Sequence, residues 1–379
     1  MIQDDIVSDL PSVNVGELVG ILTDAFASLI RSGEPFASMP SVMLWGQPGV
    51  GKSQAVRQVA DRVGEETGRK VGIADIRLLL FSPIDLRGIP SADAKKEFAV
   101  WLKPEIFKMD EGDDCFNILL LDEITSALPS VQAAAYQLTL ERAVGEHKLP
   151  DNCVVIAAGN RITDKSVAYK MPKALANRMM HFEVRSDFMA WKSWASSVGI
   201  DNRVIGFLSY RRDLLNTFDA NDDAISFATP RTWEMVSNIL KRCDESSTKG
   251  MSASAYSMIG GLVGNKVALE FMAFLEDSAN LPDIEDIFDG KATAVPSKVS
   301  SLYALCSAMV DKASKCTDDM RRIDNSLAYA EKLPRDFAIM LITDYQALES
   351  GFDMKLMKSA SFMNLLNRNS AVLNGLKRK

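Results

Sequence analysis

One stretch restricts the fold of this chain more than any other part of the sequence: Gly46-Gln47-Pro48-Gly49-Val50-Gly51-Lys52-Ser53. It follows the pattern G-x-x-x-x-G-K-S, and it lies between an apolar segment (42–45) and a segment of helical periodicity (54–60). A strand, a glycine-rich loop and a helix in this order are the context that the pattern requires. Glycines let backbone N–H groups turn toward an anion, and the following helix points its positive end at the same place. The stretch therefore predicts a phosphate-binding loop.

Lys52 and Ser53 give that loop its chemistry. A lysine at this place reaches the terminal phosphates of a nucleotide, and the neighbouring hydroxyl can ligate Mg²⁺. A chance glycine turn before a helix is the alternative, and the complete pattern in its proper context disfavours it. All the residues of 46–53 are thus candidates for binding a nucleotide.

Two carboxylates, Asp122 and Glu123, follow the apolar run 115–121. Such a run is typical of a buried parallel strand, and its carboxyl end is where α/β sheets bind ligands. Asp122 can hold Mg²⁺ through water, and Glu123 can orient or deprotonate the attacking water. The alternative is a strand that ends in the acidic first residues of a helix. The phosphate loop upstream favours the catalytic interpretation.

Asn160 follows another apolar run, 154–158. If the two runs are neighbouring strands, Asn160 lies beside Asp122, and its amide can bind both the water and the terminal phosphate. An asparagine that merely forms a turn after Gly159 explains the position equally well.

Two arginines are open to two interpretations each. Arg178 ends a short helix (173–178), where a cation suits the helix dipole, but it could also reach the nucleotide of a neighbouring subunit. Arg231 stands in the first turn of a helix opened by Thr229 and Pro230. A cation there opposes the dipole by ~0.3–1 kcal/mol, and a bound anion would remove the conflict. A solvated arginine is the alternative.

Composition and charge limit the functional classes. A chain of 379 residues can form two or three packed units, and 47% hydrophobic with 25% charged residues is typical of a soluble globular protein. The net charge of −7 does not favour a general nucleic-acid binder, although it leaves a local basic groove open.

Cysteine, histidine and hydropathy patterns indicate an intracellular protein. The five cysteines have no C-x-x-C spacing, which indicates reduced thiols inside a cell. The two histidines, His147 and His181, are far apart, so a histidine-rich transition-metal site is not expected. We see no signal-peptide pattern and no apolar run of the ~20 residues that a membrane span needs. We therefore expect a cytoplasmic protein.

The remaining pattern predicts mixed elements first and helices later. Asn14 and Glu17 form a capping box that opens a helix ending near Gly33. Further expected elements are strands at 71–78 and 180–184, a turn-rich connector at 82–90, half of a hairpin at 98–102, a helix at 131–142, a hairpin at 143–150, helices at 187–198 and 229–243, a Gly/Ser-rich patch at 249–264, a helix at 267–275, loops at 281–283 and 294–296, and several short helices within 299–373.

In their order along the chain, these motifs resemble those of the MoxR-like branch of the AAA+ ATPases. The resemblance rests on 46–53, 119–123, 158–160, 174–178 and 229–231. The strings 85–88, 122–124, 131–134 and 141–142 resemble that branch specifically, and the similarity covers about residues 10–275.

The resemblance implies a fold and a domain order. The expected class is α/β, with an AAA+ P-loop core in which helices flank a parallel sheet, then an α-helical lid and a helical C-terminal extension. The expected domains are 1–185 for the nucleotide-binding core, 186–278 for the lid and 279–379 for the extension.

The resemblance also implies a role for each motif residue. Lys52 and Ser53 match Walker A, Asp122 and Glu123 match Walker B, Asn160 matches sensor 1, Arg178 matches the trans-acting finger, and Arg231 matches sensor 2. Arg185 lies close to Arg178 in the sequence and is a rival for the finger.

The implied activity is ATP hydrolysis with Mg²⁺ in a ring, usually a hexamer, that remodels, activates or loads a partner protein. That partner is commonly a protein with a von Willebrand factor A-type domain. A competing interpretation is the motor subunit of a DNA-restriction or defence complex similar to the McrB-type GTPases, which residues 159–166 faintly resemble. No N-K-x-D guanine motif supports it. A third is a scaffold that uses ATP only to assemble, which the Asp122–Glu123 pair disfavours.

Overall fold

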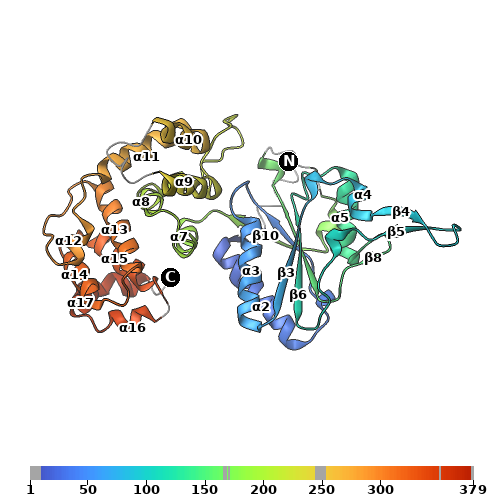
Figure 1. The fold of residues 1–379 in the computed structure, drawn as a ribbon, viewed down its shortest axis with the longest axis horizontal. Coiled ribbons are helices and arrows are strands. Elements are labelled where there is room, and N and C mark those ends of the chain that lie inside the picture. Colours follow the sequence, from blue (N-terminus) through green and yellow to red (C-terminus); the bar gives the residue numbers. More distant parts are fainter. Residues whose placement is uncertain (1–9, 165–168, 170, 244–252, 350, 377–379) are drawn as a thin grey trace. The chain divides into compact units, whose positions relative to one another are not determined.

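The computed structural model describes residues 10–164, 169, 171–243, 253–349 and 351–376 of the chain (Figure 1). Its contacts divide into two compact units. The first consists of Met1–Ala190 and Phe218–Asp223, and the second of Trp191–Thr217 and Ala224–Lys379. The predicted division into three domains stays a prediction.

The first unit is built on a six-stranded sheet with the strand order β1-β10-β2-β9-β6-β3. Every neighbouring pair in it is parallel. The strands are β1 (Ser12–Asn14), β2 (Val42–Trp45), β3 (Lys70–Arg77), β6 (Cys115–Asp122), β9 (Cys153–Gly159) and β10 (Met180–Arg185). The two most apolar strands, β6 and β9, lie next to each other inside the sheet, where both faces are covered.

Helices cover both faces of this sheet (Figure 1). One face packs against α2 (Val15–Ser32) and α3 (Lys52–Thr67), and the other packs against α5 (Pro129–Glu141). The predicted core, a parallel sheet flanked by helices, is therefore confirmed. The capping box of Asn14 and Glu17 forms as expected, and α2 ends at Gly33 in the left-handed conformation.

The segment 82–90 differs from its prediction. Instead of a turn-rich connector, Pro83–Arg87 forms the short helix α4, and Ser82 and Asp85 form its capping box. Proline fits the first helical turn as well as it fits a turn, so the same residues suit both structures. The strand β4 (Ile89–Ala92) then pairs antiparallel with β5 (Ala99–Leu102), which confirms the predicted half-hairpin.

Short elements complete the first unit. The predicted hairpin at 143–150 is present as β7 (Ala143–Val144) and β8 (His147–Lys148). The helix α6 (Lys173–Ala176) precedes β10. The chain also has 3₁₀ helices, η1 (Phe36–Ser38), η2 (Leu78–Leu80), η3 (Glu105–Phe107), η4 (Ile162–Asp164) and, in the second unit, η5 (Arg212–Leu215).

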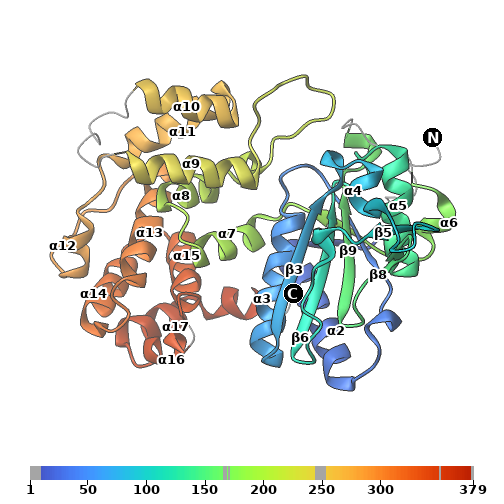
Figure 2. The same cartoon turned by 45° about the vertical axis from the view of Figure 1, so that its right-hand side comes forward.

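Helices form the second unit, as the sequence predicts from Ser186 onward. They are α7 (Phe188–Ser197, which begins in the first unit), α8 (Asn202–Tyr210), α9 (Pro230–Arg242), α10 (Ala253–Val263), α11 (Asn265–Ser278), α12 (Ile284–Phe288), α13 (Val299–Ser314), α14 (Met320–Ala330), α15 (Arg335–Gln346), α16 (Phe352–Leu356) and α17 (Ala360–Leu376). In Figure 2, α10 lies beside α9 and α11. No helix within the described ranges is long and apolar enough to cross a membrane.

The helix α10 was not predicted. Most of the Gly/Ser-rich patch at 249–264 belongs to it, while 249–252 lie outside the described residues. Ala255, Ile259 and Val263 are spaced four residues apart and are all buried, so one apolar stripe holds the helix against its neighbours. This packing overrides the low helix propensity of the two internal glycines.

Candidate active site

The loop 46–51 connects the carboxyl end of β2 to the first residue of α3, Lys52. Gly51 has a φ of +102°, a conformation that favours glycine. A Cβ on Gly46 would lie 2.5 Å from the carbonyl oxygen of Val184 in β10, so only glycine fits there. The first N–H groups of α3 have no partners within the helix, and they provide donors for an anion.

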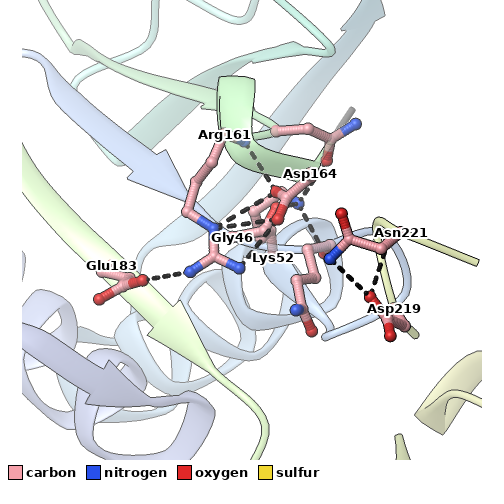
Figure 3. A network of polar contacts seen from close by, with 9 residues as sticks. Gly46, Lys52, Arg161, Asp164, Glu183, Asp219 and Asn221 are labelled. Atoms are coloured by element: carbon pink, nitrogen blue, oxygen red, sulfur yellow. Dashed lines mark hydrogen bonds and ion pairs between the residues drawn. The ribbon is translucent and has the colours of Figure 1, made fainter. Parts of the chain in front are cut away.

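Lys52 lies inside this loop and is buried. Its Nζ donates to the carbonyl oxygens of Gly46 (2.6 Å) and Gln47 (3.0 Å). It also donates to Oδ1 of Asn160 at 3.1 Å, and the close-up in Figure 3 shows Gly46 and Lys52 side by side. The structure thus brings Asn160 to the phosphate loop.

Ser53 and Asp122 come together from two elements. The Ser53 hydroxyl, in the first turn of α3, donates to Oδ2 of Asp122 at the end of β6, at 2.6 Å. A hydroxyl and a carboxylate are hard oxygen ligands, which suit Mg²⁺ when phosphate oxygens and water complete its shell. Within the described residues, no group of three or more His, Cys, Asp or Glu side chains could hold a metal ion. The hydroxyl of Ser53 and the carboxylate of Asp122 fit Mg²⁺ as two of its oxygen ligands.

Glu123 has a φ of +56°, which is uncommon for a residue with a side chain. Its N–H donates to Oδ1 of Asp122 at 2.9 Å, and its carbonyl oxygen accepts from the N–H of Ser126 at 3.0 Å. The next residue, Ile124, donates to the carbonyl oxygen of Ala158 in β9. These bonds fix a sharp turn directly after β6. The sequence carried no signal of this conformation.

Asn160 follows β9, which is the neighbour of β6. The two apolar runs are therefore adjacent strands, as the suggested role of Asn160 requires. Thr125, a residue that the sequence analysis did not select, holds its backbone. The Thr125 hydroxyl accepts from the Asn160 N–H (3.1 Å) and donates to the Asn160 carbonyl oxygen (3.3 Å). In the sequence, only its place two residues after Glu123 indicated that Thr125 could belong to the site.

Two carboxylates anchor Arg161, the residue that follows Asn160 (Figure 3). Its guanidinium donates to Asp164 (2.8 Å) and to Glu183 of β10 (2.6 Å). Burial lowers the pKa of Arg161, but the two carboxylates outweigh it, and the pKa is raised above its usual value. Asp164 is itself buried, so the network is a fixed support beside the site. Figure 3 also draws Asn221, whose N–H and side-chain amide donate to Oδ1 of Asp219 at 2.8 and 3.3 Å.

Comparison with known proteins identifies the segment that contains this site. Residues 41–181 match the model of the ATPase family associated with various cellular activities (AAA). Those residues form an AAA-family ATPase domain. No curated protein matches the chain.

Solved structures similar to the chain include three with low sequence identity. A mutant of RuvB from Thermotoga maritima is 14% identical, covers 79% of this chain and 85% of its own, and has a TM-score of 0.34. NtrX from Brucella abortus in complex with ATP is 12% identical, covers 97% and 69%, and has a TM-score of 0.37. PCH-2 from C. elegans is 12% identical, covers 69% and 67%, and has a TM-score of 0.32.

Within the AAA ATPase domain, Lys52, Ser53, Asp122, Glu123 and Asn160 belong to segments that meet at the carboxyl ends of β2, β6 and β9. In a parallel α/β sheet this is the place where a ligand binds. The chemistry that an ATPase requires, phosphate binding, cation binding and activation of water, has a candidate side chain in each case.

Arg178 lies away from this cluster. It precedes β10, whose first residue Met180 pairs with Val42, the first residue of β2. The phosphate loop follows the last residue of β2. Arg178 is exposed, and within the described part of the chain it has no hydrogen-bond or ion-pair partner.

Arg185 and Arg231 occupy different places. Arg185 ends β10 at the carboxyl end of the sheet, and it forms a 3.9 Å ion pair with Glu17. Arg231 is exposed in the first turn of α9, in the second unit, and Thr229 caps that helix as expected. The part of Arg231 in the site stays a prediction.

Proposed function

We propose that the chain is a ring-forming, MoxR-like AAA+ ATPase that uses ATP hydrolysis to remodel, activate or load a partner protein. The AAA ATPase domain at 41–181 supports the hydrolytic activity. The resemblance of the motifs to the MoxR-like branch suggests a partner with a von Willebrand factor A-type domain.

In this proposal the ATP phosphates lie against the N–H groups of residues 46–53, and the Lys52 ammonium pairs with the terminal phosphates. Ser53 and Asp122 are the residues that would hold Mg²⁺, which offsets the charge that develops on the phosphates. Glu123 orients the attacking water and accepts its proton, and the Asn160 amide holds the same water. The contacts that support this arrangement are Lys52–Asn160 and Ser53–Asp122.

One observation supports the ring most directly, namely the place of Arg178. The phosphate loop follows the carboxyl end of β2, and Arg178 lies two residues before the amino end of its neighbour β10. A four-residue strand spans roughly 13 Å, so the guanidinium cannot reach the phosphates of its own subunit without leaving its end of the sheet. An exposed arginine in this place, unpaired among the residues that the structure describes, suits a site on a second copy of the chain.

The same argument separates the two candidate fingers. Arg185 lies at the end of the sheet that carries its own phosphate loop, where Glu17 pairs with it. We therefore assign the trans-acting finger to Arg178. We assign Arg231 to the lid helix α9 as the residue that senses the γ-phosphate, because a bound anion would offset its unfavourable place at a helix N-terminus.

Light scattering coupled to size exclusion tests the assembly. We expect the Glu123→Gln variant to assemble into a ring, a hexamer in this proposal, in ATP and Mg²⁺. We expect the Lys52→Ala variant to remain at lower mass in the same buffer. If the Glu123→Gln variant stays monomeric while it binds ATP, the proposed ring is wrong.

Co-purification from the native source tests the partner. The Glu123→Gln variant is used in ATP, because slow hydrolysis should hold the ring and its partner together.

A further inference from the structure

Thr125 lies between the two segments that carry the candidate catalytic side chains. Its side chain is buried, and its hydroxyl serves both backbone polar groups of Asn160, accepting at 3.1 Å and donating at 3.3 Å. One hydroxyl thereby joins the turn after Glu123 to the end of β9.

The backbone of Thr125 is itself held in place. Its carbonyl oxygen accepts from Nε2 of Gln132 at 3.1 Å and from the N–H of Tyr169 at 2.7 Å. The same Nε2 donates to the carbonyl oxygen of Ile124 at 2.9 Å, and Gln132 is buried in α5. The helix α5 therefore fixes the turn that begins at Glu123, and Thr125 carries this constraint across to Asn160.

The two segments are also in close steric contact. A Cβ on Gly159 would lie 2.7 Å from Cγ2 and 2.8 Å from the hydroxyl oxygen of Thr125, and 3.0 Å from Cε of Met43. A side chain on residue 159 would therefore push Thr125 and Asn160 apart.

We propose that Thr125 is a positioning residue for ATP hydrolysis, whose hydroxyl sets the place of the Asn160 amide relative to Glu123 and Lys52. The inference rests on the proposed function, because it assigns Asn160 to the attacking water. Loss of the hydroxyl leaves the part-buried N–H and C=O of Asn160 without this partner, and a group that loses its hydrogen bond moves to find another. Displacement of a positioning group by about 1 Å can slow a reaction about 100-fold.

Two substitutions that differ in whether they keep the hydroxyl test this role. Thr125→Val keeps the shape and removes the hydroxyl, while Thr125→Ser keeps the hydroxyl. We expect Thr125→Val to lower kcat about 10- to 100-fold, with affinity for a fluorescent ATP analogue within about twofold of the wild type. We expect Thr125→Ser to retain kcat within about threefold. Normal turnover by a folded Thr125→Val protein overturns the proposal.

A double-mutant cycle with Asn160→Ala separates positioning from a general structural effect. If Thr125 acts through the Asn160 amide, then Thr125→Val adds no further loss of kcat once that amide is absent. Additive losses show that Thr125 acts in another way and overturn the proposal. If Thr125→Val fails to fold, Gly159→Ala displaces the same contact with the hydroxyl retained, and the same loss of kcat is expected from it.

The outcomes also distinguish this inference from the proposed function. If the wild type hydrolyses no ATP, the proposed function itself fails. If the wild type is active and Asn160→Ala slows it while Thr125→Val does not, only the assignment of Thr125 fails.

Discussion

At the scale of single residues, the backbone of Glu123 is the most informative feature of the site. A positive φ costs a residue with a side chain on the order of 1–3 kcal/mol, and it persists only where the surroundings impose it. Here the Asp122 carboxylate and the Ser126 N–H hydrogen-bond to the backbone of Glu123, and Ala158 holds the next residue, Ile124. Such strain is concentrated at functional sites. It therefore favours a catalytic role for Glu123 over the alternative, an acidic residue that merely begins a helix.

Glu123→Gln tests this choice, because the amide keeps the size of the side chain and cannot accept the proton of the attacking water. We expect kcat to fall about 100-fold or more, since general-base catalysis contributes roughly 10²–10⁴-fold. Affinity for ATP should be retained. The measurement is single-turnover hydrolysis beside equilibrium binding of ATP. Turnover at the wild-type rate would remove Glu123 from the mechanism.

The sequence predicted that Asp122 and Asn160 lie beside the phosphate loop but not how they are held. Asp122 and Asn160 could be chosen because each ends an apolar run, which is a local pattern. Thr125 could not be chosen, because its partner lies 35 residues away and the bond exists only once β6 and β9 are neighbours. The pairing of Glu183 with Arg161 could not be predicted for the same reason, because the two residues are 22 positions apart in the sequence.

At the scale of elements, local signals predicted some boundaries and failed for others. The caps at Asn14 and Thr229 were predicted, because capping depends on residues three positions apart. The segment 83–87 was misassigned because its short helix and a turn have the same composition. The helix α10 was missed because its stability comes from a buried stripe rather than from propensity.

A buried ion pair ties two elements that are distant in sequence. Nζ of Lys192, in α7, lies 2.8 and 2.7 Å from the two carboxylate oxygens of Asp344, in α15. Burial raises the pKa of Asp344, and the charge and hydrogen bonds of Lys192 oppose that shift. Both residues lie in the second unit, where this pair ties α15 to α7.

Lys192→Met should therefore destabilise the protein, because it leaves a buried carboxylate without its cation. We expect a loss of roughly 2 kcal/mol in urea unfolding, less than the ~3–5 kcal/mol of a fully buried pair, because the two side chains stay 13% and 17% exposed. Lys298→Met is a matched control, because Lys298 and its partner Asp277 are more exposed, and it should change little.

The loss should depend on pH. Without Lys192, the folded-state pKa of Asp344 lies above its value in the unfolded chain, so the folded state takes up the proton first. The destabilisation is therefore smallest below the unfolded pKa of about 4 and grows as the pH rises through the folded pKa. Unfolding at pH 5 and pH 8 should show the larger deficit at pH 8. An equal deficit at both values would mean that Lys192 contributes packing rather than charge.

At the scale of the whole molecule, the proposed site is incomplete in one copy of the chain. The groups proposed to bind phosphate lie at the carboxyl end of the sheet, while the exposed Arg178 lies at the amino end. A head-to-tail ring brings these two ends together at every junction and closes on itself, so each subunit gives an arginine to one neighbour and receives one from the other.

Mixing two inactive variants tests this arrangement. Glu123→Gln binds ATP and assembles but should hydrolyse it slowly, and it retains Arg178. Arg178→Ala retains Glu123 and the phosphate loop but should lose about 10³-fold or more in kcat. In an equal mixture, about a quarter of the junctions combine an intact Glu123 in one subunit with a neighbour's intact arginine, so about a quarter of the wild-type activity should return. Arg185→Ala is the matched control, because it removes the arginine at the other end of the same strand, and alone it should stay active. Recovery of activity from Glu123→Gln mixed with an inactive Arg185→Ala, and not from the mixture with Arg178→Ala, would transfer the finger to Arg185. No recovery from either mixture, in rings shown to contain both variants, would mean that the ATP site is complete within one subunit.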